Sequence, residues 1–131
     1  VLYQLTRQGI VPLIAHVERY AFVRSNPNLL CDLIEAGAYT QMNATSLVLH
    51  KKHQNLLLRM IRHGMIHVLA TDTHSVKKRP PMLGQAIALV TEKCGEKTAR
   101  RMIKNAGALF KGTQPSLSDP QPMRQVLGHW L

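Results

Sequence analysis

The sequence is short of cysteine and of long apolar runs, and each shortage excludes a class of protein. Its two cysteines, Cys31 and Cys94, lie far apart and match no paired zinc-binding spacing, so we expect free buried thiols. No apolar run approaches the roughly 18 residues of a membrane span, and the first residues lack the order of a secretion signal. The default expectation is a globular cytoplasmic protein.

Acidic and aromatic residues are also scarce. The sequence has seven acidic residues against 17 lysines and arginines, which gives a formal net charge of +10. Such a surplus is either a solvated basic face or the sign of an anionic partner. Nucleic acid is disfavoured, because no basic run carries the interleaved aromatics that stack on single-stranded bases. A phosphorylated protein or an acidic membrane surface fits the charge equally well.

The length and the apolar content predict one domain with a core. The 131 residues are 45% hydrophobic. Val1, Leu2 and Leu5, before Gly9, look like the end of a helix, so we expect a fragment of a longer protein. Residues 1–112 are the expected folded part. Residues 113–131, rich in proline and serine, are expected to form a poorly ordered tail in which Trp130 and its apolar neighbours could dock.

An internal repeat predicts the fold class. Gly9, Gly37 and Gly64 recur at nearly equal intervals, each just past a helical pattern, where glycine commonly adopts the left-handed C-cap conformation. Each should end a helix and lead into a strand. The expected strands are residues 10–15, 38–43 and 65–71, and the expected helices are 27–36, 47–63 and 83–94, with a shorter helical stretch after Cys94.

Two side chains are the expected helix caps: Asn26 before Pro27, and Ser46 before the long helix. Strands separated by helices of this length pair in parallel with right-handed crossovers. The sequence therefore predicts an α/β layer or part of a barrel.

Polar side chains follow each expected strand. In parallel α/β folds the loops at the carboxyl ends of the strands carry the chemistry, so these side chains should share one rim. They are His16 and Arg19 after the first strand, Gln41 and Asn43 at the end of the second, and Asp72 and His74 after the third.

His16, Asp72 and His74 are the candidate metal ligands. Imidazole and carboxylate groups suit manganese, iron or zinc, although a hydrogen-bonded structural cluster is an open alternative. The remaining histidines are weaker candidates. Of these, His67 is expected inside a strand as a satisfied core histidine, and His50, His53, His63 and His129 on helix surfaces or in the tail.

Arginines beside two of these ligands point to phosphate. Arg19 follows His16 and Arg79 follows His74, and a guanidinium donates two parallel hydrogen bonds to an oxyanion. The run Lys77-Lys78-Arg79 can also be read as merely solvated. Cys94 and Arg100 have the spacing of a thiolate phosphatase loop, but Cys94 ends a helical pattern, so chance is the better explanation.

Three ordered motifs resemble one family. They are Pro12-Leu13-Ile14-Ala15-His16-Val17-Glu18-Arg19-Tyr20, then Gln41-Met42-Asn43 with Ser46-Leu47, and then Thr71-Asp72-Thr73-His74 with Arg79-Pro80-Pro81. Together they resemble the bacterial polymerase-and-histidinol-phosphatase (PHP) type of protein tyrosine phosphatase, manganese-dependent enzymes of capsule and exopolysaccharide synthesis. The likeness spans roughly residues 1–112.

The resemblance implies a distorted (β/α)7 barrel in which a metal cluster activates a hydroxide that attacks phosphotyrosine, with no phosphocysteine. It implies that His16, Asp72 and His74 are metal ligands and that Arg19 and Arg79 bind phosphate. The implied substrate is the phosphorylated tail of a membrane-associated tyrosine kinase. Val17 and Thr73 depart from the usual proline and alanine without adding or removing a ligand.

The family's earlier ligands, including a His-x-His segment, have no counterpart in this sequence. We therefore expect the isolated chain to be weakly active or inactive and to self-associate through exposed edges. Two other functions stay open: hydrolysis of a small phosphate ester, and a basic binding module without catalysis.

Overall fold

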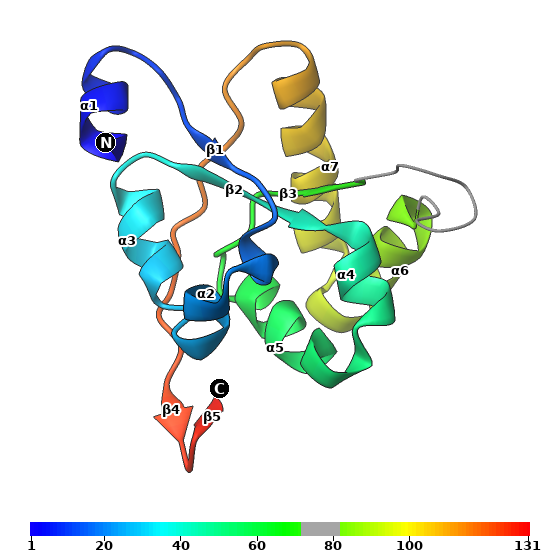
Figure 1. Ribbon diagram of the computed structural model, residues 1–131. Coiled ribbons are helices and arrows are strands. Elements are labelled where there is room, and N and C mark those ends of the chain that lie inside the picture. Colours follow the sequence, from blue (N-terminus) through cyan, green and yellow to red (C-terminus); the bar gives the residue numbers. More distant parts are fainter. Residues whose placement is uncertain (72–81) are drawn as a thin grey trace.

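The structure, a computed structural model, describes residues 1–71 and 82–131. Three parallel strands form its main sheet, in the order β1-β2-β3: β1 (Leu13–Ile14), β2 (Tyr39–Asn43) and β3 (Val68–Ala70). Helices connect them, as Figure 1 shows. The prediction of a mixed α/β fold with parallel strands is confirmed, although each strand is shorter than expected.

The helices follow the strands in chain order. Before β1 comes α1 (Leu2–Arg7). Between β1 and β2 lie η1 (Val17–Arg19), α2 (Ala21–Ser25) and α3 (Leu29–Glu35). Between β2 and β3 lie α4 (Ala44–Leu49) and α5 (Lys51–Arg62), and after β3 come α6 (Leu83–Cys94), α7 (Glu96–Phe110) and a hairpin of β4 (Gln125–Val126) and β5 (His129–Trp130).

The three repeated glycines end helices as the sequence predicts. Gly9, Gly37 and Gly64 have φ of 74°, 97° and 72°, in the left-handed region that glycine enters without a Cβ clash. After each glycine the next amide donates to the carbonyl five residues earlier: Ile10 to Leu5, Ala38 to Leu33 and Met65 to Met60. This closed helix end turns the chain back toward the sheet three times.

Both predicted helix caps are wrong. The expected helix over 47–63 is two helices broken at His50, and its cap is Asn43, whose Oδ1 accepts a hydrogen bond from the Thr45 amide at 2.9 Å. Ser46 lies inside α4. The helix expected from Pro27 begins at Leu29, so Asn26 does not cap it. Beyond Gly95 one 15-residue helix, α7, replaces the shorter stretch expected there.

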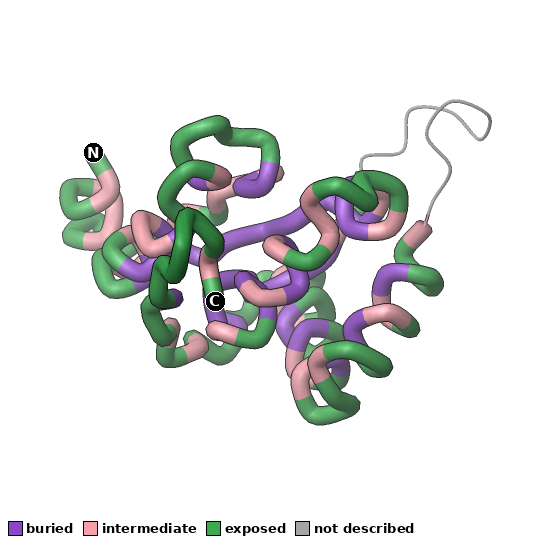
Figure 2. Tube along the Cα trace, turned by 90° about the horizontal axis from the view of Figure 1, so that it is seen from below, coloured by how far each residue is buried: buried purple, intermediate pink, exposed green. Residues whose placement is uncertain are grey.

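The core lies between the sheet and the helices beside it. Figure 2 shows the buried residues along the central strands and on the helix faces turned toward them. Its largest fully buried side chains include Leu30 of α3, Met42 of β2, Leu57 and Ile61 of α5 and Met102 of α7. Cys31 and Cys94 are free, Cys31 is buried and Cys94 half-buried, in line with the sequence prediction.

The segment after α7 packs first against the amino-terminal ends of β2 and β3 and then against α2 and α3. The prediction of a poorly ordered tail is therefore wrong, and the expectation that Trp130 could dock is confirmed. Figure 1 shows it running behind the strands to the hairpin. Hydrogen bonds hold this segment. Tyr39 Oη donates to the Pro115 carbonyl at 2.7 Å, and the Gln121 amide donates to the His63 carbonyl at 2.8 Å. Further along, the Met123 amide donates to Asn28 Oδ1 at 2.8 Å, and Trp130 Nε1 donates to the Ser25 carbonyl at 3.2 Å. The edge opposite the expected catalytic rim is thereby covered.

No helix within residues 1–71 and 82–131 is long and apolar enough to cross a membrane.

Candidate functional site

The carboxyl ends of β1 and β2 meet at one edge of the sheet. Ile14 of β1 pairs with Thr40, and Asn43 at the end of β2 pairs with Ala70 at the end of β3. Directly after β1 the chain enters η1, and directly after β2 it enters α4. The residues that follow β1 are therefore packed beside the end of β2, as the sequence predicts.

His16 lies at the entry to η1 in a conformation that few residues adopt. Its φ is 54° and its ψ 44°, in the left-handed region, which is uncommon for a residue with a Cβ and occurs often at functional sites. Its Nδ1 is buried and has no hydrogen-bond partner among the described residues. Buried polar atoms are normally hydrogen-bonded or bound to an ion, so Nδ1 is a suitable donor for a metal ion.

Glu18 is a second buried group at this place, and the sequence analysis gave it no role. The side chain is only 3% exposed; its Oε1 accepts a hydrogen bond from the Asn43 amide at 3.3 Å. Oε2 has no partner among the described residues. The only sequence signal was a carboxylate between His16 and Arg19, where a solvated loop would have been the simpler interpretation.

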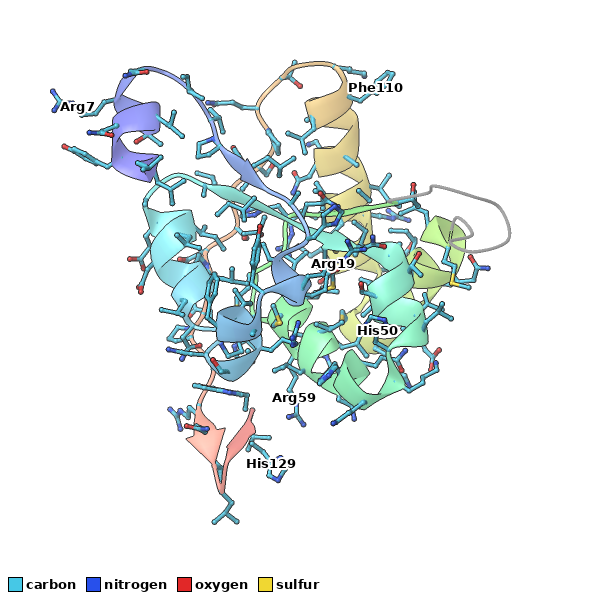
Figure 3. The ribbon with its side chains drawn as sticks, in the orientation of Figure 1. Arg7, Arg19, His50, Arg59, Phe110 and His129 are labelled. Atoms are coloured by element: carbon cyan, nitrogen blue, oxygen red, sulfur yellow. The ribbon has the colours of Figure 1, made fainter. Side chains whose placement is uncertain are left out.

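Arg19 is exposed, and its backbone is held on both sides. Its amide donates to the His16 carbonyl at 2.9 Å, and Arg24 Nη1 donates to the carbonyls of Glu18 and Arg19 at 2.8 and 2.9 Å. Figure 3 labels Arg19 on η1. The short helix therefore carries an exposed, permanently charged side chain three residues after the partly buried His16.

Gln41 and Asn43 were expected to complete the rim, and the structure gives them different places. Asn43 is at the edge, but its side chain caps α4 and its amide binds Glu18. Gln41 is also buried, and it pairs with Val68 in the sheet, before Asn43 at the end of β2. Asn43 therefore joins η1 to α4 rather than facing an open site.

Asp72, His74 and Arg79 lie outside the described residues. The structure brings His16 and Arg19 together on η1 and leaves the other three predicted site residues as predictions. Among the residues it describes, no three histidine, cysteine, aspartate or glutamate side chains gather in a metal-binding group. Even so, an unpartnered imidazole nitrogen and an unpartnered carboxylate oxygen are the donor types that suit a divalent cation.

The thiolate phosphatase interpretation of Cys94 and Arg100 does not fit the structure. Cys94 ends α6, and burial, the largest cause, raises the pKa of its thiol, which disfavours the reactive thiolate. Arg100 lies within α7, and its Nη2 is 2.6 Å from Glu96 Oε1.

The chain is similar to known proteins over most of its length. The family described as "Capsular polysaccharide synthesis, CpsB/CapC" matches residues 1–111. Tyrosine-protein phosphatase YwqE of Bacillus subtilis is 32% identical over 125 residues, covering 94% of this chain and 49% of that protein. Tyrosine-protein phosphatase CpsB of Streptococcus pneumoniae is 34% identical over 101 residues, covering 72% and 42%.

A solved structure agrees with the sequence comparisons. It belongs to the crystal structures of YwqE from Bacillus subtilis and CpsB from Streptococcus pneumoniae, described as unique metal-dependent tyrosine phosphatases. The TM-score is 0.89 at 32% identity, covering 95% of this chain and 51% of that chain. The chain thus spans about half the length of the relatives it matches.

Proposed function

The chain belongs to the CpsB/CapC family of capsular polysaccharide synthesis proteins, and from this premise we propose that the whole protein is a metal-dependent phosphotyrosine hydrolase. The observation that carries the proposal is the group formed by His16, Glu18 and Arg19 on and beside η1, in which two buried polar atoms have no partner within residues 1–71 and 82–131. The relatives' names, tyrosine-protein phosphatases, supply the substrate class.

The proposed fold of the whole protein is the distorted (β/α)7 barrel of the PHP type, of which β1, β2 and β3 are consecutive strands. Residues 1–112 would belong to the barrel, and residues 113–131 would cover its amino-terminal edge. We propose a cytoplasmic location and a phosphorylated tyrosine kinase as the protein substrate. The net charge of +10 suits such an anionic partner.

His16 would hold the metal together with Asp72 and His74, and manganese is the proposed ion. When bound, a divalent metal supplies a nucleophile at neutral pH and positive charge for the phosphoryl oxygens. Glu18 lies beside His16 in sequence and binds the Asn43 amide, so it fixes η1 against the end of β2. Through this contact it positions the histidine and the arginine.

Arg19 would bind the phosphate of the substrate. Its guanidinium is exposed and stays charged at any working pH, and its planar fork matches two phosphoryl oxygens. Because Arg24 holds the Arg19 carbonyl, the backbone that carries the guanidinium does not need to become ordered when the substrate binds. Arg79 would be the second arginine.

Arg19→Lys tests the role of the guanidinium. In the whole protein we expect kcat/KM on a phosphotyrosine peptide to fall roughly 10-fold to 100-fold, because an ammonium cannot make the paired hydrogen bonds. The measurement is phosphate release with manganese and with a chelator. Arg100→Lys, an exposed change in the Glu96 ion pair of α7, is the matched control and should keep full activity.

His16→Ala tests the proposed metal ligand. We expect lower bound manganese, measured by elemental analysis after gel filtration, together with a loss of activity. Full metal content and full activity in this variant would contradict the proposed ligand. Rates on small phosphate esters, compared with those on the peptide, distinguish a protein phosphatase from an enzyme of small-molecule metabolism.

A further inference from the structure

A cavity of about 560 Å³ lies between α5 and the β4-β5 hairpin. Its volume falls within the range of small-molecule sites. One wall is a stripe of α5 that includes Lys52, Leu56 and Arg59, and the other is the hairpin from Val126 to Leu131. The described residues of the candidate site, His16, Glu18 and Arg19, do not line it.

The cavity is basic. Lys52, His53 and Arg59 face it from α5 and His129 from the hairpin, and no acidic side chain lines it in the part of the chain that the structure describes. Arg59 and His129 are labelled in Figure 3 on α5 and on the hairpin. Arg59 Nη1 also donates a hydrogen bond to the Trp130 carbonyl, so the guanidinium ties the hairpin to α5.

The start of α5 adds unfavourable charge. Its first turn holds Lys51, Lys52 and His53 with no acidic residue, and the side chain of His50 does not cap it. Cationic side chains at the positive end of the helix dipole are electrostatically unfavourable. Bound negative charge would offset this repulsion.

The hairpin supplies an apolar wall at an unusual place. Leu127 and Gly128 form its turn with φ of 50° and 78°. Such turns favour asparagine and glycine, because the left-handed conformation is energetically unfavourable for most residues that carry a Cβ. Leu127 is nevertheless there, 95% exposed, beside Val126 and Trp130. Leu127 therefore places an exposed apolar side chain at the rim of the cavity.

We propose that this cavity binds the phosphorylated tyrosine side chain of an acidic peptide, as a second contact that holds the substrate of the proposed phosphatase; the proposal rests on that function. Leu56, Val126 and Leu127 would contact the ring, and Lys52, His53 and Arg59 would donate to the phosphate. A peptide held here has a raised local concentration near η1. The chain runs from η1 through α2 directly to Ser25, whose carbonyl binds Trp130.

Trp130 makes the proposal testable, because it is the only tryptophan of the chain and lines the cavity. The ligand is a peptide that carries 4-phosphonomethyl-phenylalanine, which no phosphatase hydrolyses, and the solution contains a chelator. We expect a saturable change in Trp130 fluorescence with this peptide and none with the same peptide carrying tyrosine. Inorganic phosphate should bind more weakly, because it lacks the ring.

Two variants address the two halves of the cavity. Lys52→Gln should weaken the binding of the phosphonate peptide roughly tenfold, which is the loss expected for one charge-assisted hydrogen bond. Lys104→Gln, an exposed lysine of α7 outside the cavity, is its control and should bind normally. Leu127→Gly introduces a residue that adopts positive φ readily, so the turn should be retained. It should weaken the binding of the peptide but not the binding of inorganic phosphate.

Three results would overturn the proposal: unchanged Trp130 fluorescence at saturating peptide, equal binding by Lys52→Gln and the original chain, or tighter binding of a single-stranded oligonucleotide than of the phosphonate peptide. None of these measurements involves turnover. A whole protein that is inactive on phosphotyrosine yet binds at Trp130 would refute the proposed function alone.

Discussion

His67 shows how a single neutral imidazole can join distant parts of the chain. Its Nδ1 lies 3.1 Å from the Thr40 amide nitrogen and 2.9 Å from Thr40 Oγ1, and its Nε2 lies 3.2 Å from Ser118 Oγ. Ser118 Oγ in turn donates to the Gly64 carbonyl. His67 lies directly before β3 rather than inside a strand, but its interpretation as a satisfied core histidine is confirmed, since the side chain is 1% exposed and hydrogen-bonded.

The state of His67 predicts a pH dependence of stability. Burial, and then the charge of Arg101, lower its pKa from 6.5 to about 4. Between these values the unfolded chain binds a proton that the folded chain does not, so stability should fall as the pH drops from about 6.5 to about 4. The loss is at most about 3 kcal/mol. Urea unfolding at several pH values measures it.

His67→Gln is the control for this prediction. Glutamine does not titrate, so the variant should be less stable at pH 7 but should lose less stability on acidification. An identical pH dependence of both proteins would assign the effect to other groups.

At the scale of elements, the tail depends on how α5 ends. Gly64 follows α5 with φ of 72°, and a Cβ built there would lie 3.2 Å from the Asp119 carbonyl oxygen and 3.4 Å from the Ser118 Cβ. Gly9 has nearly the same φ, 74°, but a Cβ there would meet no atom of the described residues within 4 Å. The two positions share a backbone conformation and differ only in the neighbouring tail.

Alanine at each glycine therefore separates two costs. Both substitutions should lose about 1–2 kcal/mol for the left-handed conformation. Gly64→Ala should lose about 1 kcal/mol more, because the tail must move away. Chemical unfolding measures the free energy of unfolding of both variants. Equal losses would mean that the tail moves at Ser118 and Asp119 without an energetic cost.

The elements also show what could be predicted from the sequence. The glycines at 9, 37 and 64 are local signals, and they correctly located three helix ends. The caps failed because the helices begin elsewhere: α4 begins at Ala44 with Asn43 as its cap, ahead of Ser46, and α3 begins at Leu29, beyond Asn26. The packing of the tail could not be predicted, because Trp130 and its acceptor Ser25 are far apart in sequence.

The candidate site was predicted to a similar extent. His16 and Arg19 were found because a strand pattern ends beside them, and the structure places both on or next to η1. Glu18 was missed, since only its burial distinguishes it from a solvated loop carboxylate. Asp72, His74 and Arg79 stay predictions.

For the whole molecule, the strand order leaves β1 at an edge of the sheet. Ile10, Val11 and Leu13 are 47%, 42% and 43% exposed beside it. The outer side of an edge strand, with apolar side chains beside it, can pair with a strand of another chain. In the relatives, which are about twice as long, additional chain is present that can cover such an edge.

We therefore expect the isolated chain to self-associate at roughly micromolar concentrations or above. Val11→Lys should shift it toward the monomer in light scattering, because a charge at the edge opposes strand pairing. Phe110→Lys removes a side chain that is 94% exposed at the end of α7, and it should leave association unchanged. A monomeric original chain would contradict the prediction.

The tail that covers the amino-terminal edge has a consequence for folding during synthesis. Chains leave the ribosome from the N-terminus, so β2, β3 and His67 are made well before Ser118 and Met123. Until then Tyr39, His67 and Asn28 lack their tail partners. The sheet can form early, but this edge closes only when the last segment arrives. A pause in translation between Gly112 and Ser118 would thus prolong the aggregation-prone stage.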